Sequence, residues 1–111
     1  MEFYGLRLEY ALVGSSNYIE WKDRMEVVLE DNGLKEFIDQ EIAKPATTNA
    51  QELAKWKKCV AKARRILLEG VQDHIVLSLH GKETPLSMWE ALKDLYQNNS
   101  DQRKLALKDK L

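Results

Sequence analysis

The sequence predicts a single all-α domain of about five or six helices, and three observations favour this fold. Apolar residues recur at steps of three and four along most of the chain. Only two prolines and five glycines interrupt that pattern, which favours helices over strands and turns. Three tryptophans, at positions 21, 56 and 89, lie in three separate amphipathic segments. One large aromatic side chain per helix can anchor a small core.

Length and charge narrow the class of protein. A chain of 111 residues is most simply one domain with one modest core. Its 17 basic and 18 acidic residues leave a net charge of −1, so no strong overall field attracts nucleic acid or anionic lipid. The lone Cys59 cannot form an internal disulfide, which suits a reducing compartment. No stretch approaches the roughly 18 apolar residues of a membrane span. We therefore expect a cytoplasmic protein with no membrane partner.

The first half of the chain begins with an arm, residues 1–13, that we expect to be extended or to form a small strand. Asn17 and Glu20 are spaced as a capping box at the start of the first helix. That helix would end near Gly33, a plausible left-handed terminator. A short helix through residues 34–38 follows. Residues 41–50 resemble a loop, and Pro45 within it stops the preceding helix.

The second half predicts a long helix capped by Thr48 or Asn49, with Gly70 breaking or bending it. A further helical segment would run to Gly81. Thr84 followed by Pro85 is a strong start signal for the next helix. We interpret residues 98–100 as a turn, with Ser100 capping a last helix over 101–111.

The helical stripes together define a predicted core. We place in it the apolar and aromatic residues that share one face of each predicted helix: Tyr18, Trp21, Met25, Leu29, Trp56, Val60, Leu67, Ile75, Leu79, Trp89, Leu92 and Tyr96.

The sequence offers no set of residues with the spacing of a catalytic or metal site. His74 and His80 are six residues apart and do not form a chelating pair on a helix. Cys59 has no histidine near it in sequence to act as a base. Glycine-rich phosphate loops and nucleophile elbows are absent. We therefore expect no enzyme activity, no metal, no cofactor and no small-molecule substrate.

One charged face stands out on the predicted long helix. Lys55, Lys58, Lys62 and Arg65 fall within roughly 80° of one another, opposite the apolar stripe. Residues 53–68 contain no acid. This face is consistent with a plain solvated surface, with a contact to an acidic protein surface, or with RNA phosphates. It lacks an interleaved aromatic residue for base stacking.

Three stretches, in this order, resemble the N-terminal part of the Gag polyprotein of copia-type LTR retrotransposons, a family common in plant genomes. The first runs from Leu12 through Gly14, Asn17-Tyr18 and Trp21 to Met25, Leu29 and Gly33-Leu34. The second joins Trp56 to the helix at 61–68 and to residues 71–75. The third is Trp89-Glu90-Ala91-Leu92-Lys93-Asp94-Leu95-Tyr96, ahead of Ser100, Arg103-Lys104 and Leu105.

The resemblance implies a capsid-forming protein, with a small orthogonal helical bundle like the N-terminal domain of a capsid protein. It places that domain at residues 14–99 and the start of a linker or second-domain helix at 100–111. The expected function is self-assembly, and the expected partner is a second copy of the chain. The Cys/His zinc knuckle of a full Gag is absent from this sequence. The alternatives are an RNA-binding module that uses the basic face and a host protein-interaction adaptor derived from Gag.

Overall fold

The computed structural model describes residues 5–109, and the side chains of residues 5–97. The fold is a small all-α bundle, which confirms the predicted class. Its five α-helices are α1 (Tyr18–Asp31), α2 (Glu36–Asp39), α3 (Ala50–Glu69), α4 (Asp73–Val76) and α5 (Pro85–Asp109). Short 3-10 turns lie at Leu8–Tyr10, Ser15–Asn17 and Leu77–Leu79. Within the described residues, strand-like pairing is limited to one parallel bridge between Leu12 and Val71.

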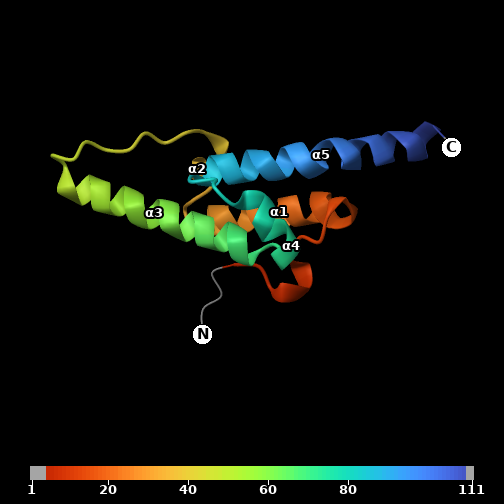
Figure 1. The fold of residues 1–111 in the computed structure, drawn as a ribbon, viewed down its shortest axis with the longest axis horizontal. Helices are drawn as coiled ribbons and strands as arrows, with labels where there is room; N and C mark the ends of the chain where they lie inside the picture. The colour runs from red at the N-terminus through yellow and green to blue at the C-terminus, as the bar shows by residue number, and fades with distance from the viewer. Residues whose placement is uncertain (1–4, 110–111) are drawn as a thin grey trace.

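The two long helices, α3 and α5, give the molecule its elongated shape of 59 × 31 × 24 Å. Figure 1 shows them on two sides of the bundle, with α1 and α4 beside them. The C-terminal part of α5 extends beyond the body at one end. The first turns of α3 and the loop before them extend beyond it at the other end. The core therefore occupies only the middle of the molecule.

The core is built around Trp21 of α1, whose side chain is fully buried. Its ring stacks on that of Trp89 from α5 with centroids 5.5 Å apart, and the Tyr18 ring lies 6.1 Å away on α1. Tyr18 in turn contacts Tyr96 of α5 at 6.0 Å. Offset and tilted ring pairs at these distances are favourable beyond the area they bury. These aromatic contacts hold α1 against α5.

Gly70, at the end of α3, joins three separate parts of the chain. Its carbonyl oxygen accepts a hydrogen bond from the Trp21 indole N–H at 2.7 Å and another from the Leu12 backbone N–H at 3.0 Å. The last carbonyls of a helix have no partner within the helix, so these donors satisfy one that would otherwise be buried unpaired. A β-carbon at position 70 would collide with the Met25 side chain. The atom it would meet is the terminal methyl group of Met25, so a larger residue here would require Met25 to move.

Nine of the twelve residues predicted for the core are buried, and Trp56, Val60 and Tyr96 are half-buried against it. These three residues pack against the buried cluster from its edge. The sequence prediction also omitted several buried side chains, most of which come from short or irregular segments: Ala11, Leu12, Leu34, Phe37, Ile38, Ala63, Ile66, Val71 and Met88.

Two predicted helix starts are confirmed. The Asn49 side chain accepts a hydrogen bond from the Glu52 backbone N–H at the start of α3. At the start of α5, Thr84 and Ser87 exchange hydrogen bonds: each side-chain oxygen accepts from the other's backbone N–H, at 3.1 and 3.2 Å. Reciprocal pairing of this kind satisfies two free donors of a first helical turn.

The predicted capping box at the start of α1 is wrong. Asn17 precedes α1, but its side chain makes no cap hydrogen bond. Instead its amide oxygen accepts from the Val13 N–H and its amide nitrogen donates to the Ala11 carbonyl, both at 3.0 Å. Asn17 thus holds the end of the N-terminal segment, where Ala11 and Leu12 are buried, against the bundle. A polar side chain before a helix can serve the preceding loop as well as the helix.

The predicted turn at residues 98–100 is also wrong, because α5 continues through it to Asp109. Ser100 is therefore not the cap of a separate last helix. Asparagine and serine in a helix interior cost only a few tenths of a kcal/mol each relative to better helix formers, about the level that flanking turns can offset. Residues 110–111 of the predicted last helix, and residues 1–4 of the predicted arm, lie outside the described residues.

Candidate interaction surfaces

The side chains that could take part in catalysis or bind a metal lie on different elements. His74 lies on α4 with its Nε2 atom 3.0 Å from the Val13 carbonyl oxygen, where it ties α4 to the N-terminal segment. His80 is exposed after the last 3-10 turn, and Cys59 is half-buried on α3. In the described part of the chain, no three His, Cys, Asp or Glu residues are grouped to hold a metal ion.

Charge is strongly segregated between two helical regions. Residues 53–68 of α3 carry six basic residues and no acid, a net charge of +6. Residues 17–41, which span α1 and α2, carry eight acids and three bases, a net charge of −5. The overall charge of −1 conceals this division. The charge of the chain is therefore divided between α3 and the region of α1 and α2, although its total is close to neutral.

The four basic residues singled out from the sequence share one side of α3. Lys55, Lys58 and Arg65 are exposed, and Lys62 is half-exposed. Among residues 5–97, Lys55, Lys58 and Arg65 have no ion pair with an acid. The structure thus places these side chains together and leaves at least three of them available to a charged partner.

The acidic region has a different arrangement. Lys22 pairs with Glu26 at 3.8 Å on α1, and Lys35 pairs with Asp39 at 2.9 Å across α2. The hydrogen bond to the Asp39 carboxylate, together with its charge, raises the pKa of Lys35. Asp23 and Glu30 lie on the exposed side of α1, with Val27 between them at 64% exposure. The intramolecular pairs therefore use the region's lysines and leave Asp23 and Glu30 facing solvent.

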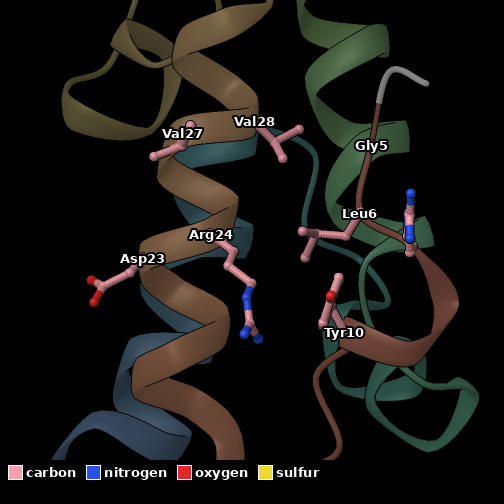
Figure 2. Close-up of a pocket in the computed structure, with 8 residues that line it drawn as sticks. Gly5, Leu6, Tyr10, Asp23, Arg24, Val27 and Val28 are labelled. Atoms are coloured by element: carbon pink, nitrogen blue, oxygen red, sulfur yellow. The ribbon is translucent and has the colours of Figure 1, made fainter. Parts of the chain in front are cut away.

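An apolar groove lies between the N-terminal segment and α1 (Figure 2). It has a volume of about 600 Å³, and its lining includes Leu6 and Tyr10 on one wall and Asp23, Val27 and Val28 on the other. The Arg24 guanidinium lies over the Tyr10 ring, 4.3 Å from its centroid, and so bridges the two walls. A cation over an aromatic face is favourable when partly desolvated. Sequence reasoning missed this groove because its walls come from segments that periodicity does not relate.

Two smaller cavities flank Trp56. Their volumes are about 430 and 320 Å³, and both are lined by Ile42 and Ala43 of the loop before α3. The Trp56 indole N–H donates to the Ile42 carbonyl at 3.2 Å, so the side chain connects the loop to α3. The tryptophan has a structural contact here and space on both sides of it.

Within residues 5–97 the structure presents charged helix faces and apolar grooves. The groove is mainly apolar, and the two cavities beside Trp56 mix apolar and polar side chains. The described residues include no helix long and apolar enough to cross a membrane. The described residues thus form a small helical bundle with charged faces and an apolar groove on its surface.

Comparison with known proteins identifies the family. Residues 25–111 match the gag-polypeptide family of LTR copia-type elements, and the chain belongs to that family. The chain is also 30% identical over 108 residues to the retrovirus-related Pol polyprotein from transposon TNT 1-94 of Nicotiana tabacum. That alignment covers 96% of this chain but only 8% of the tobacco protein. No solved structure matches the fold.

Proposed function

We propose that this chain is a structural Gag module that self-associates as part of a capsid-type assembly. The observation that carries the proposal is membership of the copia-type gag-polypeptide family over residues 25–111. The structure supports it with a small rigid core and large charged faces on exposed helices. Weak contacts of this kind, repeated over many copies, can hold an assembly through avidity. On family grounds we place this assembly in the cytoplasm and propose that the module is not catalytic.

The test is light scattering coupled to size-exclusion chromatography over a concentration series. A mass that rises with concentration supports the proposal. A monomer at every concentration, at both low and moderate salt, contradicts self-association by this chain. Thermal melting of the same samples shows whether the protein is folded in each condition.

RNA binding is the second candidate, and the acid-free face of α3 favours it. Lysine and arginine side chains that neutralise phosphates release counterions, so affinity should fall steeply as salt rises. Fluorescence anisotropy with a labelled single-stranded RNA measures this directly. Binding that is absent, or that does not change with salt, contradicts the candidate. A host-adaptor function, the third expectation from the sequence, has no specific observation in its favour.

A further inference from the structure

We infer that the exposed basic face of α3 in one copy of the chain binds the exposed acidic face of α1 in another copy. This inference rests on the proposed self-association and specifies the surface that would mediate it. On α3 the contact would use Lys58 and Arg65 of the basic face and Ala61 between them, all of which are exposed. The acidic face consists of Asp23, Val27 and Glu30, all exposed on α1.

The two faces match in sequence spacing. Asp23, Val27 and Glu30 are separated by four and then three residues, and so are Arg65, Ala61 and Lys58 when α3 is followed backwards. Each set spans about 60° of its helix and about 10.5 Å along the axis. An antiparallel pairing therefore places Asp23 opposite Arg65, Val27 opposite Ala61 and Glu30 opposite Lys58. Each face presents two charges with a non-polar residue between them.

The acidic face is accessible in a single copy of the chain. Figure 2 shows Asp23 and Val27 pointing away from the N-terminal segment, while Arg24 points toward Tyr10. Asp23 and Val27 also line the groove, so the acidic face borders the groove along α1, and both side chains remain exposed. Val27 is 64% exposed, and burying it against Ala61 would remove apolar surface from water. The small Ala61 side chain allows the two helices to approach closely.

A second copy is favoured over other occupants by charge complementarity. The basic region carries +6 and the acidic region −5, and both lie on the same chain. Opposite charges on facing surfaces increase the association rate and fix the register, while like charges oppose the wrong pairing. Because the two faces differ, each copy that uses one face still offers the other. Such a head-to-tail contact forms rings or extended assemblies.

The test uses charge reversal on each face of the full 111-residue chain. We expect Asp23→Lys with Glu30→Lys, or Lys58→Glu with Arg65→Glu, to weaken self-association at least about tenfold, because each leaves like charges opposed. An equimolar mixture of the two variants should recover association, because each supplies the face that the other lacks. The variant with all four changes should recover it alone. The matched control is Lys82→Glu with Glu90→Lys, two exposed positions outside both faces, which should behave like the unmodified chain.

The outcomes distinguish this inference from the proposed self-association on which it rests. If the unmodified chain associates and neither reversal changes it, the inference is overturned while self-association stands. If the unmodified chain never associates, both are overturned. If only the basic-face variant loses association, and nuclease treatment of the unmodified chain causes the same loss, that face binds nucleic acid and the inference is overturned. Recovery in the mixture after nuclease treatment supports it.

Discussion

Trp21 and Trp56 occupy similar amphipathic patterns, yet the structure uses them differently. Trp21 is fully buried, stacks on Trp89 and donates to the Gly70 carbonyl, so it joins three parts of the chain. Trp56 is half-buried, has a cavity on each side and donates to the Ile42 carbonyl of one loop. The difference shows that periodicity orients a side chain toward the body, while the facing elements determine how fully it is covered.

The largest expected effect comes from Trp21→Ala. Removing a fully buried tryptophan should cost about 3–5 kcal/mol of the free energy of unfolding, a large part of the roughly 5–15 kcal/mol of a small domain. Urea or thermal unfolding measures it. Trp21→Phe should cost less, because it keeps an aromatic ring and removes the hydrogen bond to Gly70. Equal stability of Trp21→Ala and the unmodified chain would show that Trp21 is not central to the core.

Gly70→Ala tests the junction that Trp21 contacts. The added methyl group would displace the terminal methyl group of Met25 and approach the Ile66 carbonyl oxygen at 3.2 Å. Because the end of the Met25 side chain can move, we expect a cost of about 1–2 kcal/mol, toward the lower end for an overpacked core. Gly5→Ala is the matched control, because a β-carbon at Gly5 meets no other atom. If both variants unfold at the same denaturant concentration as the unmodified chain, the close approach of Met25 is not needed for stability.

Trp56→Ala should cost about 1–2 kcal/mol, less than Trp21→Ala, because a smaller area leaves contact with the core. Its effect should be local, and a glutamate-specific protease should cleave faster after Glu41, an exposed residue in the loop that Trp56 contacts. Trp56→Phe separates the hydrogen bond to Ile42 from the packing of the ring. A cost as large as that of Trp21→Ala would remove the distinction between the two regions.

Asn17→Ala should give the smallest of these effects, about 1 kcal/mol, through loss of two hydrogen bonds to the N-terminal segment. Hydrogen exchange should increase at the Val13 amide before it increases in α1. Asn17→Asp keeps an acceptor for the Val13 N–H and loses the donor to the Ala11 carbonyl. Its stability should therefore lie between that of the unmodified chain and that of Asn17→Ala. A loss of helicity confined to the first turn of α1 would instead support the capping box.

Spacing rules predicted the elements whose signals are local. Gly33 has the left-handed φ of 71° expected of a helix terminator, and the caps at Asn49 and Thr84 form as expected. The turn at residues 98–100 failed because asparagine and serine permit a turn without requiring one. The basic residues of α3 were found from sequence alone, because their common face depends only on helical geometry.

Other features required the folded chain. The apolar groove lies between residues 5–10 and α1. The matching spacing of Asp23–Glu30 and Lys58–Arg65 bears on binding only because both faces are exposed in the folded chain. The burial of Leu12 depends on its hydrogen bonds to Gly70 and Gln72, which lie about sixty residues away in sequence. Local patterns contain no information about such distant partners.

The sequence by itself determined the all-α class, the main helices, about half of the buried core and the division of charge between α1 and α3. These properties follow from side-chain type and helical period, which act over a few residues. The tertiary structure decided that Trp21 is central and Trp56 peripheral, and that Asn17 serves the N-terminal segment. It also decided which charged faces remain in solvent. Burial and exposure depend on which distant segment packs opposite, and that is settled only when the whole chain folds.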